Sequence, residues 1–221
     1  MTDVSMPVES EALRPAWPQV SDEFADRAAR VVVAGLFLAL AFRIGADFVQ
    51  TMRVTGLLLV ASEGLVAVLT VARRRAVAVD RSWTARAVTA IALAGPPLLR
   101  PADGQALLPE LQAAMLSAGG LAVIVAGKLS LGRSFGVVPA NRGVVSAGVY
   151  RFVRHPIYAG YLVTHGAFLF SHLSVWNAVV LLAGDGMLLV RAAYEERTLI
   201  QDPAYVQYRS RVRWRVVPGV Y

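Results

Sequence analysis

A basic segment runs directly into a long apolar stretch at Arg154-His155-Pro156. Proline fixes φ and suits the first position of a helix, so we expect a helix to begin at Pro156. A helix start exposes unpaired N–H groups and a partial positive charge, which favour an anion or the acceptor atoms of a bound molecule. Tyr158 and Gly160 would follow in the first turns, where glycine lets a ligand or a second helix approach closely. The alternative is an ordinary arginine at the membrane surface beside a helix-start proline.

A second polar cluster, Glu195-Glu196, follows a helix that we expect to end with Arg191-Ala192-Ala193-Tyr194. Adjacent acids near the carboxyl end of a helix oppose its dipole and need cationic partners, either arginines or a bound cation. Because the runs 157–171 and 174–193 are joined by a short loop, they should form a hairpin that returns both clusters to the same membrane face. Arginine on one side and carboxylate on the other would suit a zwitterionic amino-acid group. Simple surface pairing with neighbouring arginines is the alternative.

The elements that must position these clusters are strongly apolar. Of 221 residues, 56% are hydrophobic and only 17% are charged, which is typical of an integral membrane protein. A helix needs about 20 apolar residues to cross about 30 Å of hydrocarbon, and only helices satisfy the backbone of such runs in lipid. We therefore predict an all-α integral membrane protein of five or six transmembrane helices with a C-terminal helical hairpin. The six runs are 31–49, 54–72, 84–99, 107–127, 157–171 and 174–193.

The distribution of charge predicts an orientation. In the six-helix topology, 19 of the 22 Lys and Arg residues fall on one side, which identifies that side as cytoplasmic. Both termini and the segment 128–156 would then be cytoplasmic. A composition rich in Ala, Val and Arg suggests a prokaryotic inner membrane. The net charge of +7 fits the lipid bilayer as a partner rather than nucleic acid, because no basic stripe with interleaved aromatic residues occurs.

We expect no metal site. The sequence has no cysteine, and Glu63, His165 and Asp185 are scattered over three apolar runs without ligand spacing. An unpaired ionisable group at that depth is costly, so each of the three should face the protein interior or a partner.

Three regions are predicted along the chain. They are a cytoplasmic lead-in over residues 1–28, partly disordered up to Pro18, a transmembrane scaffold of four spans over 29–127, and a catalytic region over 128–221. In the last region, Asp202 should cap an amphipathic helix with Pro203 at its first position. Tyr205, Tyr208 and Trp214 near this helix suit the headgroup layer.

Several of these motifs together resemble a known family. The pattern Gly148-x-Tyr150-x-x-x-Arg154-His155-Pro156-x-Tyr158-x-Gly160 is followed by a hairpin, by Glu195-Glu196 and by Tyr205-x-x-Tyr208-x-x-Arg211-Val212. This order is similar to that of the integral membrane methyltransferases related to isoprenylcysteine carboxyl methyltransferase and to phospholipid methyltransferases. The resemblance covers about the last 95 residues. It departs where Val212-Arg213-Trp214-Arg215 replaces the family's Val-Pro, and where the segment between Glu196 and Tyr205 is shorter.

The resemblance implies a cytoplasmic cofactor site for S-adenosylmethionine, between the arginine-histidine-proline segment and the hairpin. A lipophilic acceptor would enter from the bilayer. The cofactor-binding residues implied are His155, Pro156, Tyr158, Gly160, Glu195 and Glu196. The catalytic residues implied are Arg154, Arg211 and Glu196.

A carboxylate is already a nucleophile at neutral pH, whereas an amine must first lose a proton. Because no dedicated base is obvious, we favour a carboxyl O-methyltransferase of the isoprenylcysteine type. Three alternatives stay open at this point: a phospholipid amine N-methyltransferase, an NADPH-dependent membrane reductase of the sterol-reductase type, and a membrane protein without catalytic activity.

Overall fold

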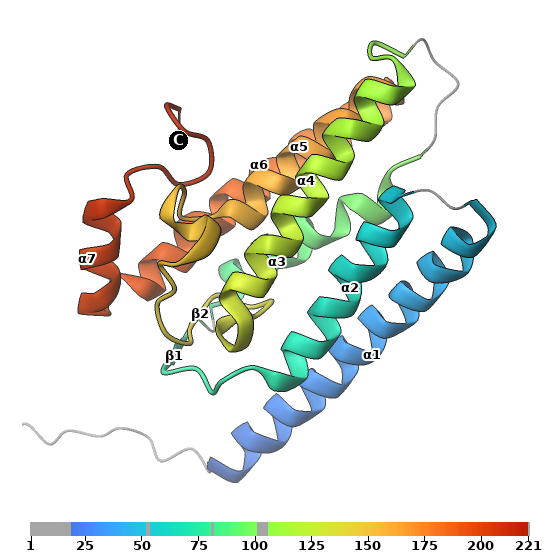
Figure 1. The fold of residues 1–221 in the computed structure, drawn as a ribbon. Coiled ribbons are helices and arrows are strands. Elements are labelled where there is room, and N and C mark those ends of the chain that lie inside the picture. The colour runs from blue at the N-terminus through green and yellow to red at the C-terminus, as the bar shows by residue number, and fades with distance from the viewer. Residues whose placement is uncertain (1–18, 52–53, 81, 101–105, 221) are drawn as a thin grey trace, which may run out of the picture.

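The structure, a computed structural model, describes residues 19–51, 54–80, 82–100 and 106–220. The predicted disorder up to Pro18 lies outside this range. Seven α-helices dominate the described chain, with three short 3-10 helices between them (Figure 1). The α-helices are α1 (Gln19–Thr51), α2 (Val54–Ala72), α3 (Trp83–Ala94), α4 (Glu110–Leu131), α5 (Pro156–Ser171), α6 (Val175–Leu199) and α7 (Pro203–Arg211). The 3-10 helices are η1 (Pro96–Leu98), η2 (Gly132–Ser134) and η3 (Gly148–Arg151).

Local sequence signals set several helix ends as predicted. Helix α5 begins with Pro156 at its first position. Helix α7 begins at Pro203, and the Asp202 carboxylate accepts a hydrogen bond from the Ala204 N–H at 2.9 Å. The Asn141 side chain donates a second bond to Asp202 at 3.0 Å, and these two bonds hold the pKa of this carboxyl below its usual value.

One helix differs from the prediction. Helix α6 continues to Leu199, so Glu195 and Glu196 lie within it rather than after its end. The i,i+4 pair of Arg191 with Glu195, at 3.2 Å, stabilises this last part of the helix.

The Gly95-Pro96-Pro97 sequence predicts an early end of the third helix, and the structure confirms it. Helix α3 has only 12 residues, and the chain then turns into η1.

Two helices of the described chain could cross a membrane, judged by their length and composition. Among the described residues, Glu110–Ser134 and Val175–Leu199 are long and apolar enough to cross a membrane, and Leu58–Ala72 is apolar but shorter. At 1.5 Å per residue, helix α3 reaches only about 18 Å, less than the hydrocarbon thickness. The number of five or six spans therefore stays a prediction.

Short connections join the first and second, the third and fourth, and the fifth and sixth apolar runs, which predicts that each of these pairs forms an antiparallel hairpin. The structure confirms this only in part. Helix α1 packs along α2, α2 packs on α4, and α4 packs closely along α5 (Figure 1). Helix α3 packs against α6 instead of α4, so the third and fourth apolar runs do not form a packed hairpin within the described chain. Helix α7 lies beyond the end of α6, away from α1 (Figure 1).

A small β-pairing departs from the all-α prediction. Strand β1 (Ala78–Val79) pairs antiparallel with β2 (Ala140–Asn141). This pairing ties the α2–α3 connection to the loop after α4, because two extended segments at the same end of the helices satisfy each other's backbone groups.

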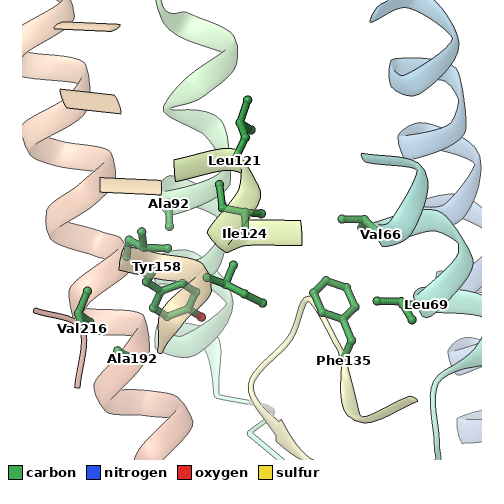
Figure 2. Close-up of a cluster of buried hydrophobic side chains, with 11 residues drawn as sticks. Val66, Leu69, Ala92, Leu121, Ile124, Phe135, Tyr158, Ala192 and Val216 are labelled. Atoms are coloured by element: carbon green, nitrogen blue, oxygen red, sulfur yellow. The ribbon is translucent and has the colours of Figure 1, made fainter. Parts of the chain in front are cut away.

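One hydrophobic cluster joins the two halves of the chain. Figure 2 shows Val66 and Leu69 of α2 facing Ile124 of α4, with Tyr158 and Val216 on the other side. Ile124 is completely buried. The start of α5 is therefore positioned by packing against both the N-terminal helices and the C-terminal segment.

Helices α4 and α5 approach each other through two glycines. A Cβ atom on Gly120 would lie 2.8 Å from the Gly160 carbonyl oxygen, and one on Gly160 would lie 2.6 Å from the Gly120 carbonyl oxygen. Contacts this short exclude any larger side chain without movement of the backbone. Gly160 thus serves helix packing, one of the two uses expected from the sequence.

We expect Gly120→Ala to lower the free energy of unfolding by about 1–3 kcal/mol, because the added methyl group must push α4 and α5 apart. Gly119→Ala is the matched control, since nothing lies within 4 Å of a Cβ on Gly119. Thermal unfolding of the purified variants in detergent measures the difference. Equal melting temperatures for the two variants would contradict the close approach of the helices.

Candidate functional site

The two polar clusters meet at one end of the α5–α6 pair, as predicted. Arg154 Nη1 lies 3.0 Å from Glu196 Oε2, and His155 Nε2 lies 3.2 Å from Glu196 Oε1. Arg215 Nε donates to Glu196 Oε2 at 3.2 Å. Glu196 is buried, and both of its carboxylate oxygens are engaged by side chains of the protein.

Glu195 points to a different set of partners. The Tyr158 hydroxyl donates to Glu195 Oε1 at 2.6 Å, and Arg191 Nη2 contacts the same oxygen at 3.2 Å. Among the described residues, its other oxygen, Oε2, has only a longer contact of 3.6 Å with His155 Nδ1. The His155 and Tyr158 rings are stacked with centroids 5.2 Å apart, so an aromatic surface lies between the two glutamates.

The C-terminal segment Arg213–Val216 holds Arg154 and His155 in place. The Arg154 N–H donates to the Trp214 carbonyl at 2.9 Å, and the His155 N–H donates to the Arg215 carbonyl at 2.7 Å. Arg154 Nη2 also donates to the Arg213 carbonyl at 3.2 Å. The sequence did not predict that this segment holds Arg154 and His155. The feature that could have indicated it is the sequence Val212-Arg213-Trp214-Arg215, which stands where the family has Val-Pro.

A small, partly open pocket with a cavity volume of about 100 Å³ lies beside these residues. Its walls come from residues 131–145, from the end of α6 and from α7, with Arg154, His155 and Glu195 among the lining side chains. This volume is below the range of about 300–1,000 Å³ that is usual for sites of small ligands. Arg142, which the sequence analysis had not singled out, is buried and also lines the pocket.

The other residues implied by the resemblance lie around the pocket or outside it. Pro156 is buried at the start of α5, and Gly160 packs on α4. Arg211 is exposed at the end of α7, where its Nε donates to the Gln207 carbonyl at 3.4 Å. The structure does not bring Arg211 to the cluster of Arg154 and Glu196.

Tyr205 and Tyr208 lie in the pocket wall, which corrects the prediction that they face the headgroup layer. Both are buried, packed in a cluster with Tyr150 and Val212. Burial raises the pKa of Tyr208 to about 12 and that of Tyr150 well above its ordinary value. Their hydroxyls therefore stay protonated at neutral pH, and the Tyr208 hydroxyl donates to the Tyr150 carbonyl at 2.7 Å. The buried face of α7 therefore packs against the protein.

The three ionisable residues within apolar runs have partners, as expected. Lys128 Nζ donates to Ser62 Oγ at 2.7 Å and lies 3.7 Å from Glu63 Oε1. His165 Nδ1 lies 2.6 Å from Asp185 Oδ1. No group of three or more His, Cys, Asp or Glu side chains suited to a metal ion occurs in the described part of the chain.

The charges around the pocket suit a ligand that carries both signs. Glu195 contributes a carboxylate to the pocket wall, and Arg142 and Arg154 contribute guanidinium groups. An aromatic pair formed by His155 and Tyr158 lies beside Glu195 and tolerates a neighbouring positive charge.

Comparison with known proteins gives a match to a family model. No curated protein matches the sequence. Residues 114–201 match the family model described as isoprenylcysteine carboxyl methyltransferase, a range that includes both polar clusters and ends before α7. Members of this family are integral membrane methyltransferases that use S-adenosylmethionine. This match supports membership of residues 114–201 in the isoprenylcysteine carboxyl methyltransferase family.

Proposed function

We propose that this protein is a membrane methyltransferase that transfers a methyl group from S-adenosylmethionine to the carboxylate of a lipophilic, isoprenylcysteine-like acceptor. The observation that carries the proposal is the junction of Arg154 and His155 with Glu195 and Glu196 beside the pocket. The family match over residues 114–201 supports the same reaction class.

Glu195 is the residue that would hold the cofactor's ammonium group. It lines the pocket, and within the part of the chain that the structure describes its Oε2 has only the 3.6 Å contact with His155. Glu196, by contrast, already accepts from Arg154, His155 and Arg215. We therefore assign Glu196 to positioning Arg154 and His155, whereas the resemblance implied that it binds the cofactor and takes part in catalysis.

The remaining residues would orient the reactants. Bound S-adenosylmethionine supplies an electrophilic methyl carbon on a sulfonium group. The stacked rings of His155 and Tyr158 would lie near that positive charge. Pro156 and Gly160 would act through the backbone, by starting α5 and by locking it against α4. Alignment of nucleophile, methyl and sulfur accounts for most of the catalysis in such displacements.

Arg154 would hold the acceptor carboxylate in line with the methyl group. A carboxylate is a sufficient nucleophile without a general base, so no residue needs to remove a proton. Arg211, exposed at the end of α7, would attract the acidic end of the acceptor at the membrane surface. We further propose that the pocket opens to the cytoplasm and that the acceptor enters sideways from the bilayer.

Calorimetric titration with S-adenosylhomocysteine tests the cofactor assignment. We expect the wild-type protein to bind it, and we expect Glu195→Gln to weaken binding by about tenfold or more, because a charged hydrogen bond is lost. Glu110→Gln is the matched control, since Glu110 is exposed at the start of α4. Unchanged affinity in Glu195→Gln would remove Glu195 from the site. Binding of NADPH in place of S-adenosylhomocysteine would favour a reductase, and binding of neither would favour a protein without catalytic activity.

A further inference from the structure

Helices α4 and α5, which lie side by side in Figure 1, enclose a second cavity. Its volume is about 210 Å³, and it is open to the outside of the protein. All of the residues that line it are apolar. We call it the α4–α5 groove and define it by Gly119, Gly120 and Val123 of α4 and by Ala159, Gly160 and Val163 of α5.

The groove is open space above a close contact of two helices. Gly120 and Gly160, whose backbones meet, are buried and form its floor. Gly119 is exposed, and nothing lies within 4 Å of a Cβ atom placed on it. Val123 and Val163 are 37% and 43% exposed. The missing side chain of Gly119 therefore leaves room for a chain that lies along the two helices.

The groove follows the same pair of helices as the polar pocket. The Ala159 N–H of the groove donates to the carbonyl of His155, a pocket residue, at 3.1 Å. On α4, Val123 of the groove and Leu131 of the pocket are eight residues apart, and the Ile157 side chain packs on α4 between them. At 1.5 Å per residue, the groove begins about 6 Å from His155 along α5.

The polar pocket suits only part of a lipophilic acceptor. Its volume is about 100 Å³, and its walls include Arg154, His155 and Glu195. A hydrocarbon chain against these side chains would take them out of water without giving them a partner, which is costly. The groove has about twice the volume and apolar walls. Because lipid tails are as apolar as the groove, it would hold a chain by close van der Waals contact with its small residues.

We propose that the α4–α5 groove holds the hydrocarbon chain of the lipophilic acceptor, so that the acceptor carboxylate reaches Arg154 and His155 in the neighbouring pocket. This inference deepens the proposed function and rests on it. Gly119 is then a specificity-determining residue, because its lack of a side chain sets the room available to the chain.

The test places a side chain in the groove. Gly119→Leu fills the open space, and Gly35→Leu is the matched control, because Gly35 is an exposed glycine of α1 with nothing within 4 Å of its Cβ position. Protein in nanodiscs receives methyl-labelled S-adenosylmethionine and an equal mixture of N-acetyl-S-farnesylcysteine and N-acetyl-S-geranylcysteine. The ratio of the two products reports the preference for the longer chain.

We expect Gly119→Leu to lower the ratio of farnesyl to geranyl product by about tenfold, because a misfit of one methylene group in an apolar site has an effect of about this size. Binding of S-adenosylhomocysteine and the melting temperature should equal those of Gly35→Leu. If Gly119→Leu does not fold, Val163→Phe narrows the groove from α5 and should lower the product ratio in the same direction.

An unchanged product ratio in the groove variants would overturn the inference and would leave ordinary lipid tails as the occupants of the groove. An equal change in Gly35→Leu would overturn it as well. In both cases the wild-type protein still binds S-adenosylhomocysteine and transfers the methyl group. Absence of wild-type binding and transfer would overturn the proposed function, and the assignment of the groove with it.

Discussion

Glu196→Gln is expected to lower the free energy of unfolding by about 3–5 kcal/mol and to abolish methyl transfer. Removing one member of a buried charged network leaves the others without a partner, which is the origin of costs of this size. Here Arg154, Arg215 and His155 all contact the Glu196 carboxylate within 3.2 Å. Chemical unfolding of the purified protein in detergent measures the stability, and transfer of a labelled methyl group measures the activity.

Glu195→Gln is the natural control, because the two acids are adjacent on α6. Glu195 is about 20% exposed, and it lines the pocket. Its replacement should mainly weaken donor binding and should affect unfolding less. A reversed result, with Glu196→Gln stable but unable to bind S-adenosylhomocysteine, would mean that Glu196 holds the cofactor and that the assignment of the two acids is wrong.

Lys128→Met should destabilise the protein by a similar amount, about 3–5 kcal/mol. Lys128 is 1% exposed at the end of α4, and it contacts Ser62 and Glu63 of α2. The substitution keeps an unbranched side chain but leaves the Glu63 carboxylate in an apolar interior without its cation. This pair links α2 to α4. We therefore expect chemical unfolding to show the loss of stability even if the variant keeps an intact pocket.

A double replacement separates charge from packing. Lys128→Met combined with Glu63→Leu should recover most of the lost stability, since replacing a buried ion pair by apolar side chains is often neutral or stabilising. Additive destabilisation by the two substitutions would show that the side chains contribute through packing and not through their charges.

The parts of the site that the sequence predicts are those fixed by local chemistry. Pro156 defines the start of α5 by its ring, and Asp202 caps α7 by a bond two residues away. The meeting of the two polar clusters follows from one short connection between α5 and α6, because a hairpin returns its ends to the same side.

Tertiary contacts account for what the sequence left out. Helix α6 continues past residue 194 because its acids find partners on distant segments, such as Arg215 with Glu196. Tyr205 resembles an interfacial aromatic residue by composition, yet packing with Tyr150 places it in the pocket wall. Lys128 follows an apolar run and was counted as a cytoplasmic charge, but Ser62 and Glu63 hold it inside.

The most direct test of the proposed reaction is the fate of the methyl group. Protein in nanodiscs is incubated with methyl-labelled S-adenosylmethionine and N-acetyl-S-farnesylcysteine, and the lipid extract is then treated with base. A methyl ester releases labelled methanol under these conditions, whereas an N-methyl group does not. We predict base-labile label in the wild-type reaction and none with Glu196→Gln. Label that resists base would identify an amine acceptor, and the absence of any transfer to this acceptor or to added phospholipid would contradict the methyltransferase proposal.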